Sequence, residues 1–229
     1  MKLTRTQSLK YGLSGLLVSS TSLPLYILVP NVYVKSYGLS LATIGVILMM
    51  IRLLDALTDP FFGKLVDKTQ SRKKFQFWAI PSGIIMTIGY AALINPPDAL
   101  NNELEILTYM AFFTLIVSTA AGVFNVTIQA WPLQWTSDIL DQSELVSRRE
   151  QLTLIGIIVA STLSTTTDPK IFTTYLFVLT IVTSLAILSL PSAQIASRMR
   201  SSFNWDRLRS LAFLMGPLFI SCLLYTSPS

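Results

Sequence analysis

The sequence predicts an all-α integral membrane protein. Of the 229 residues, 52% are hydrophobic and only 13% are charged, a composition that soluble domains rarely have. The apolar residues are gathered in windows of about 20 residues, which is the length at which a helix crosses the hydrocarbon of a bilayer. These windows are apolar on all sides rather than along one face, which indicates helices that contact lipid.

The apolar windows predict six complete helices and the start of a seventh. The expected ranges are 11–35, 41–64, 75–95, 104–131, 149–167 and 171–191, with a further helix from about 210. The first window is longer than the core of a signal peptide and lacks a small-residue cleavage site, so it is interpreted as a retained span. We therefore expect a transmembrane bundle at 1–192, a basic cytoplasmic linker at 193–209 and a truncated seventh helix at 210–229. The chain is interpreted as a fragment.

The lysine and arginine residues are distributed unequally between the predicted loops. Arg52 lies within a span, Lys35 and Lys170 lie in loops on one side, and all the others of the 17 lie on the opposite side. Under the positive-inside rule this asymmetry predicts a cytoplasmic N-terminus in the cytoplasmic (inner) membrane. The net charge of +5 thus reflects membrane topology rather than nucleic-acid binding.

Few residue types are available for chemistry within the membrane. The chain has 1 cysteine, Cys222, and no histidine. These counts leave no disulfide framework, thiolate metal site or histidine proton relay. Any ion chemistry must therefore use carboxylates, hydroxyls, amides and backbone carbonyls.

The segment IRLLDALTDPFFGKLVDKTQSRKK, residues 51–74, places ionisable residues inside a predicted span. Asp55 and Asp59 are four residues apart and Arg52 is three residues before Asp55, so all three share one helix face. A charge at the centre of a membrane helix costs about 2.5–3.5 kcal/mol, so this face must point into the bundle. Pairing Arg52 with Asp55 leaves one negative charge, which one monovalent cation or proton would neutralise. The pattern predicts a site for Na⁺, Li⁺ or H⁺.

Further oxygen atoms are expected near this face. Pro60 cannot donate a hydrogen bond to the carbonyl of Ala56, which predicts a kink and a free oxygen one turn away. Thr58 supplies a hydroxyl, and hard cations prefer such oxygen ligands. The alternative interpretation of the ionisable face is a structural salt bridge between helices.

Polar residues on two other helices have two interpretations each. Asn125 and Gln129 are one turn apart, and they either form interhelical hydrogen bonds or contact the cation and a solute hydroxyl, respectively. Ser19 and Ser22, in SSTSLP, either permit close helix packing or contact the solute.

Several segments together resemble one known family. They are YGLSGL, GLS before the second helix, RLLDALTDPFFGKLVDKTQSRKK and the region 125–134. These segments resemble the glycoside-pentoside-hexuronide:cation symporters of the major facilitator superfamily, which include melibiose permease. The most specific part is R-x-x-D-A-x-x-D-P followed by G-x-x-x-D-x-T-x-S-R. The resemblance implies the N-terminal six-helix half of a major facilitator fold.

The resemblance also implies roles for individual residues. Asp55 and Asp59 match the aspartates that bind the coupling cation, Arg52 matches a neighbouring arginine, and Thr58 matches an asparagine ligand. The family has an Asn or Asp at the position of Asn125. In the family, a cytoplasmic loop locks the helices during alternating access. The positions that match this loop are Gly63, Asp67, Ser71 and Arg72.

The sequence departs from the family at its sugar site. Val18 and Ser19 stand where the melibiose transporter has a lysine and an aspartate, and Ile157 stands where it has a sugar-contacting arginine. Thr127 replaces a usual proline. The resemblance therefore implies the cation site more strongly than a particular sugar.

We expect a secondary active transporter, not an enzyme, that couples entry of a sugar, glycoside or related polar solute to Na⁺ or H⁺. No cofactor and no metal other than Na⁺ is expected. The solute would contact Ser19, Ser22 and Gln129 at the interface with a missing C-terminal six-helix half.

Three alternatives remain open at the level of the sequence. An amphiphile or lysolipid carrier of the same fold would suit the weak polarity of the first helix. A membrane-bound enzyme of lipid or glycan assembly would need a catalytic grouping that the acids outside the second helix do not form. A non-transporting membrane scaffold predicts that neutralising Asp55 and Asp59 is harmless or stabilising.

Overall fold

The computed structural model describes residues 4–69, 71, 73–97, 102–136, 138–166 and 168–191. Within these residues the chain forms six α-helices and no strand. The helices are α1 (Arg5–Tyr37), α2 (Leu41–Lys68), α3 (Lys74–Ile94), α4 (Glu103–Trp135), α5 (Ile139–Thr166) and α6 (Pro169–Leu188). The predicted helices up to residue 192 are confirmed. The predicted linker and seventh helix lie outside the described residues.

Some helices extend well beyond their apolar windows. The prediction that the fifth helix begins at 149 is wrong, because α5 begins at Ile139. Polar residues outside the hydrocarbon still form helical hydrogen bonds, and the added turns pack on the bundle. Leu145 is fully buried, and the hydroxyl of Ser8 in α1 donates to the carboxylate of Glu144 at 3.2 Å.

Among the described helices, five are long and apolar enough to cross a membrane, namely α1, α2, α3, α4 and α6. The exception is α5, whose first half carries Arg148, Arg149 and Glu150. The span predicted at 149–167 covers the second half of α5.

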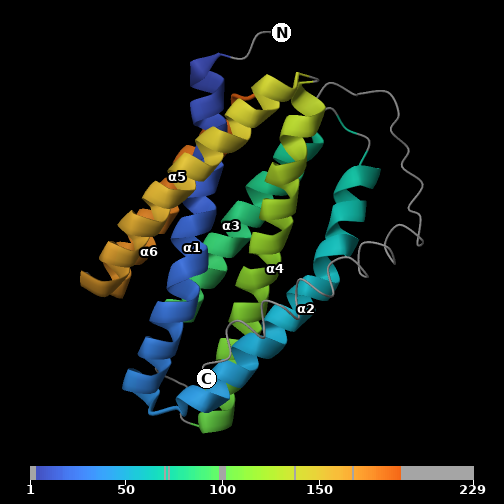
Figure 1. The fold of residues 1–229 in the computed structure, drawn as a ribbon. Helices are drawn as coiled ribbons and strands as arrows, with labels where there is room; N and C mark the ends of the chain where they lie inside the picture. The colour runs from blue at the N-terminus through green and yellow to red at the C-terminus, as the bar shows by residue number, and fades with distance from the viewer. Residues whose placement is uncertain are drawn as a thin grey trace, which may run out of the picture. The chain divides into compact units, whose positions relative to one another are not determined.

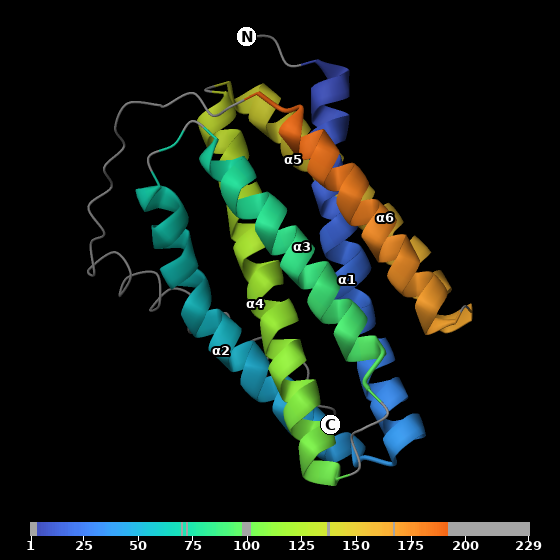
Figure 2. The same cartoon turned by 180° about the vertical axis from the view of Figure 1, so that it is seen from behind.

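Successive helices alternate in direction (Figures 1 and 2). The starts of α1, α3 and α5 therefore lie at the same end of the bundle as the ends of α2 and α4. This end, here called the basic end, carries Lys10, the lysines of the α2–α3 connection, and Arg148 and Arg149. Lys35 and Lys170 lie at the opposite end, so the predicted asymmetry of charge exists in three dimensions.

The closest helix packing is between α1 and α5, and α4 packs on both α3 and α2. Glycines permit the approach of α1 to α5. A Cβ atom added at Gly156 of α5 would lie 2.9 Å from the carbonyl oxygen of Leu16, and one added at Gly15 would lie 2.5 Å from that of Arg149. Such small-residue contacts are typical of membrane helices, which lack a hydrophobic driving force for association.

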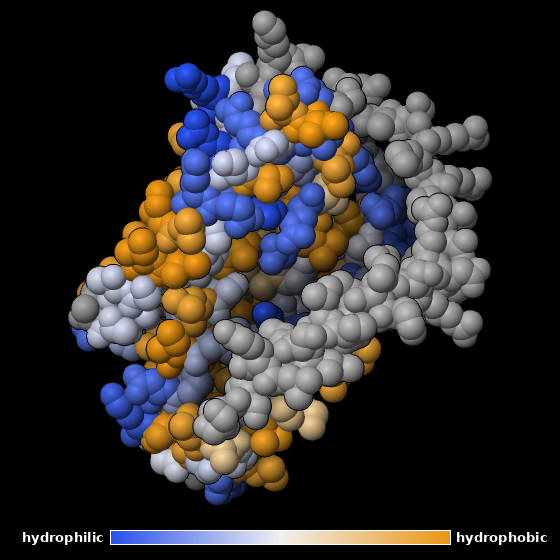
Figure 3. Space-filling model, viewed as in Figure 1, coloured by the Kyte–Doolittle hydropathy of each residue, from blue (hydrophilic) through white to orange (hydrophobic). Residues whose placement is uncertain are grey.

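The outer faces of the helices are apolar. On the face shown in Figure 3, hydrophobic side chains are prominent on the left flank, and hydrophilic ones gather mainly toward the basic end, with a smaller group near the opposite end. Leu57 of α2 and Leu185 of α6 are 70% and 62% exposed. Large exposed apolar side chains of this kind indicate surfaces that contact lipid or another helical bundle.

Candidate functional site

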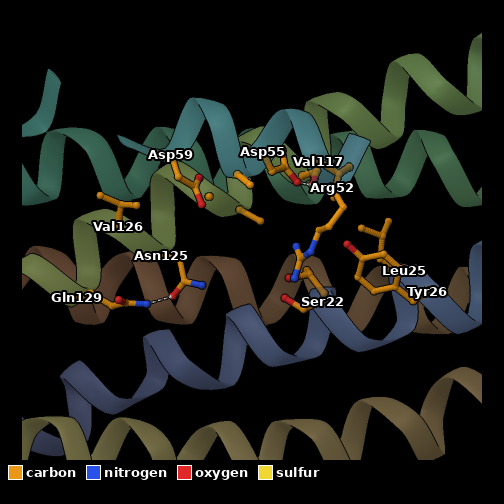
Figure 4. Close-up of a pocket in the computed structure, with 15 residues that line it drawn as sticks. Ser22, Leu25, Tyr26, Arg52, Asp55, Asp59, Val117, Asn125, Val126 and Gln129 are labelled. Carbon is orange, nitrogen blue, oxygen red and sulfur yellow. Dashed lines mark hydrogen bonds between the residues drawn. The ribbon is translucent and has the colours of Figure 1, made fainter. Parts of the chain in front are cut away.

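A pocket of about 370 Å³ lies between α1, α2 and α4. It is lined by residues that the sequence analysis had selected on separate grounds. Those that the structure brings together here are Ser22, Arg52, Asp55, Asp59, Asn125 and Gln129 (Figure 4). The ionisable face of α2 therefore points into the bundle, as its charge requires.

Asp55 is the more enclosed of the two aspartates, with 7% of its surface exposed. The hydroxyl of Ser118 in α4 donates a hydrogen bond to its Oδ2 atom. A hydrogen bond to a buried carboxylate offsets part of the cost of removing that charge from water. The bond also ties α2 to α4 at the pocket.

Asp59, one turn further along α2, is half-buried and is held by shape alone. Its carboxylate forms no hydrogen bond or ion pair with another described residue. It lies against Gly122 of α4, where an added Cβ atom would be 2.6 Å from Oδ1. The absence of a side chain at Gly122 gives this carboxylate its place beside α4.

Arg52 does not form the expected ion pair with Asp55. In the described part of the chain, neither aspartate of the pocket is within 4.0 Å of its guanidinium nitrogens. The side chain extends toward Ser22 and Tyr26 on α1 (Figure 4), and its Cζ atom lies 5.5 Å from the centroid of the Tyr26 ring. The direct pair is absent; Asp55 instead accepts a hydrogen bond from Ser118, and the guanidinium lies near the π face of Tyr26. Two carboxylates and one guanidinium still line a single pocket.

The α4 wall supplies the amide groups. The Nε2 atom of Gln129 donates to Oδ1 of Asn125 at 3.2 Å, and both side chains line the pocket. Ser118, Gly122, Asn125 and Gln129 follow one another at intervals of four, three and four residues, which places them on one helix face. Opposite them on α1, the hydroxyl of Ser22 donates to its own backbone at the carbonyl of Val18, 2.8 Å away.

Two predicted site residues lie elsewhere. The hydroxyl of Thr58 donates to the backbone carbonyl of Asp55 at 3.2 Å, and Thr58 is not among the residues that line the pocket. Ser19 is buried between α1 and α5, in contact with the position of Gly156, and donates to the carbonyl of Leu16 at 3.1 Å. The geometry gives no support to the ligand role of Thr58 or the solute role of Ser19.

The predicted gating positions lie along the last turns of α2 and the connection to α3. A Cβ atom at Gly63 would contact Val126 of α4 at 3.7 Å. Asp67 is exposed, and the hydroxyl of Ser71 accepts a hydrogen bond from the backbone N–H of Lys73 at 3.3 Å. Arg72 lies outside the described residues. A locking role for these positions stays a prediction.

Sequence reasoning gave no site role to Ser118, Gly122 or Tyr26. For the first two a signal existed, since both fall on the polar face that Asn125 and Gln129 define on α4. Tyr26 has no comparable signal, because its contact with Arg52 depends on how α1 and α2 approach each other.

The chemistry of the pocket suits a small hard cation. Its ligands are carboxylate, hydroxyl and amide oxygens, the atom types that such cations prefer. Among the described residues no group of three or more His, Cys, Asp or Glu converges in the manner of a metal centre.

A bundle of membrane helices with ionisable side chains that line a pocket between the helices fits a membrane transporter. Residues 9–206 match the model of a family described as "MFS/sugar transport protein". This match covers most of the chain, which therefore belongs to that family. The six described helices account for part of a major facilitator fold.

Two relatives from Escherichia coli (strain K12) agree with this assignment. The protein named "Putative glycoside/cation symporter YagG" is 30% identical over 166 residues, which cover 70% of this chain and 35% of that protein. The "Inner membrane symporter YicJ" is 29% identical over 129 residues, covering 54% of this chain and 27% of that protein. The predicted resemblance to glycoside:cation symporters is confirmed. The chain spans about a third of the length of these relatives.

Proposed function

We propose that the protein is a symporter that couples the transport of a sugar, glycoside or related polar solute to the entry of Na⁺ or H⁺. The family membership and the names of the two relatives support a transporter of this kind. The proposal places the protein in the cytoplasmic membrane with its basic end toward the cytoplasm, because basic loops are retained on that side.

The observation that carries the proposal is the charge of the pocket. Asp55 and Asp59 contribute two negative charges and Arg52 contributes one positive charge, and Asp59 has no hydrogen-bond donor among the described residues. The excess negative charge is costly in a bundle surrounded by lipid. One bound monovalent cation removes it, so occupancy favours the conformations in which the site is enclosed.

The ligands follow from the same geometry. Asp55 and Asp59 hold the cation, and the Oδ1 atom of Asn125, which also lines the pocket, is a candidate ligand from α4. Pro60 leaves the carbonyl of Ala56 without its usual donor, and Ala56 also lines the pocket. Arg52 balances charge from the α1 side, next to Ser22, where it can respond to a solute.

The solute site is proposed to be shared with a second helical bundle. Ser22 and Gln129 line the open pocket, so they can contribute hydroxyl and amide groups to a polar solute. The two relatives are long enough to contain a second bundle. A wall from that bundle would complete the site near the middle of the membrane.

The cation site can be tested on the purified chain in lipid nanodiscs. Binding of ²²Na⁺ is measured by scintillation proximity, and proton release on addition of Na⁺ is measured in weak buffer. If the unmodified chain binds ²²Na⁺ or releases protons on addition of Na⁺, we expect Asp59→Asn to abolish that binding or that release. The reason is that the variant lacks the excess negative charge of the pocket. Asp168→Asn is the matched control, since Asp168 is an exposed residue that precedes α6 outside the pocket.

Transport is then measured in vesicles that contain the protein in its full-length form. We expect Asp59→Asn to eliminate accumulation of a labelled methyl glycoside driven by a Na⁺ or H⁺ gradient, while exchange down a concentration gradient can persist. Accumulation in Asp59→Asn equal to that of Asp168→Asn, together with unchanged cation binding, would reject the proposal.

A further inference from the structure

A second hollow lies on a different face of α4 from the cation pocket. It is a groove of about 600 Å³ between α2, α3 and α4, and it shares no lining residue with the first pocket. Phe62 of α2, Trp78 and Ile85 of α3, and Leu115 and Thr119 of α4 are among its lining residues. We call it the outer groove.

The outer groove exists because α2 and α3 both pack on α4 but scarcely touch each other. Figure 2 shows α3 in front of α4, with α2 beside them. Small side chains on α3 and α4, Ser82, Thr119 and Ala120, line the groove between the larger aromatic side chains. The groove is open on the outer surface of the described helices, since Phe77 on its edge is 65% exposed and Ile85 is 49% exposed.

The length of the outer groove matches one leaflet of a bilayer. Along α3 the lining residues run from Phe77 to Ile85, a rise of about 12 Å at 1.5 Å per residue. Half of the hydrocarbon thickness is about 15 Å. The groove begins within one turn of the start of α3 at the basic end. It therefore fits one acyl chain of the leaflet on that side.

The chain next to the end of the groove at the start of α3 carries polar and positively charged residues. The indole N–H of Trp78 donates to the hydroxyl of Thr69 at 3.0 Å, which fixes the ring below the α2–α3 connection. Lys73 precedes Phe77 by four residues, one helical turn toward the surface, and Lys68 adjoins Thr69. Both lysines are exposed, and Asp67 is the acidic residue beside them.

We propose that the outer groove binds an anionic phospholipid, with one acyl chain in the groove and the phosphate group at Lys68 and Lys73. Charge complementarity selects this occupant over a zwitterionic lipid, because each lysine near an anionic surface improves binding about fivefold. Lys74 has a separate role, since it is buried with its ammonium group 4.9 Å from the centroid of the Phe75 ring. The lipid site is independent of the proposed transport activity.

The experiment uses the purified chain in nanodiscs of phosphatidylcholine, with small amounts of lipid brominated on the acyl chain. Bromine quenches nearby tryptophan fluorescence, and the part of the quenching that is lost in Trp78→Phe reports on the groove. We expect brominated phosphatidylglycerol to quench this part several-fold more strongly than brominated phosphatidylcholine at equal mole fraction. The paired change Lys68→Gln and Lys73→Gln should reduce that preference by about fivefold or more. The matched control is Lys35→Gln with Lys170→Gln at the opposite end, which should retain it.

A second pair of variants tests the groove itself. Thr119→Phe should fill the groove and lower quenching by phosphatidylglycerol, whereas Val178→Phe, on the lipid-exposed surface of α6, should not. Circular dichroism verifies that each variant is folded. The proposal is wrong if the two lipids quench equally. It is also wrong if the preference for phosphatidylglycerol persists in the variant that lacks Lys68 and Lys73, or if Thr119→Phe and Val178→Phe change the quenching equally.

Discussion

Asp59 and Gly122 show how a single missing side chain can define a binding position. The carboxylate of Asp59 has no hydrogen-bond partner among the described residues, so its location depends on the space that Gly122 leaves beside α4. Gly122 leaves room for the carboxylate beside α4 and does not neutralise its charge. The charge therefore remains available to a cation.

Gly122→Ala should impair cation binding while leaving the fold intact. The added Cβ atom would lie 2.6 Å from Oδ1 of Asp59, and the carboxylate can move away by side-chain rotation because it is the end of a flexible group. Disturbing the group that positions a ligand typically lowers metal affinity by about tenfold or more. Na⁺ titration of the purified variant by scintillation proximity measures the change.

Gly45→Ala is the control for Gly122→Ala, because a Cβ atom at Gly45 of α2 meets nothing within 4 Å. Both variants make the same chemical change in a membrane helix. If they bind the cation equally well, Gly122 does not position Asp59.

At the scale of residues, the sequence located the charges but not their partners. Asp55, Asp59 and Arg52 could be assigned to one face because helical spacing is a local property. The partner of Asp55 is Ser118 and that of Arg52 is Tyr26, and both contacts depend on the approach of other helices. Thr58 was assigned to the site by its nearness in sequence and by the family resemblance, whereas its hydroxyl donates to the backbone carbonyl of Asp55.

At the scale of elements, the apolar windows predicted each helix but underestimated α5. The segment before 149 is polar, so hydropathy alone does not distinguish a loop from a helix outside the membrane. Ser19 was misplaced for a related reason, since nothing local indicates that α5 packs against that face of α1. The packing of α5 on α1 is the most extensive contact between two helices of the fold, and the sequence did not predict it.

Gly156→Ala should destabilise the bundle at this contact. The new Cβ atom would lie 2.9 Å from the carbonyl oxygen of Leu16 in α1, and a helix backbone cannot move aside without loss of packing. Overpacking of this kind costs about 1–3 kcal/mol. The gain in helical propensity from replacing glycine is at most about 1 kcal/mol. Unfolding of the purified chain by heat or denaturant in mild detergent measures the difference, and stability no lower than that of Gly45→Ala would contradict the expectation.

The end of α6 depends on a side chain from α3. The Nε2 atom of Gln76, which is 6% exposed, donates to the carbonyl oxygens of Ile187 at 3.2 Å and Leu190 at 3.0 Å. Gln76→Leu would leave the carbonyl oxygen of Leu190 without this donor, at a cost of about 1–3 kcal/mol, whereas the carbonyl oxygen of Ile187 still accepts the backbone N–H of Leu190 at 3.2 Å. The same unfolding measurement should show this loss but no comparable loss for Gln151→Leu, because Gln151 is exposed. Equal stability of the two variants would show that water or lipid satisfies the carbonyl of Leu190.

At the scale of the whole molecule, the alternating directions of the helices explain why the charge pattern was predictive. Each connection reverses the chain, so loops that alternate in basic content separate onto two ends of the bundle (Figure 1). The sequence therefore predicted which loops share an end. The outer groove was not predictable in this way, because it results from the divergence of α2 and α3 on the surface of α4.

The orientation in the membrane can be tested with single cysteines at the two ends. In a Cys222→Ser background, Ser71→Cys reports on the basic end, and Ser36→Cys reports on the opposite end; both positions are exposed. A basic end held in the cytoplasm predicts that a membrane-impermeant maleimide labels Ser36→Cys in right-side-out vesicles and Ser71→Cys in inside-out vesicles. The two positions flank α2, so each serves as the control for the other. Labelling of both from one side would contradict the crossing of the membrane by α2. A reversed pattern would instead place the basic end, and with it the lysines of the outer groove, outside the cytoplasm.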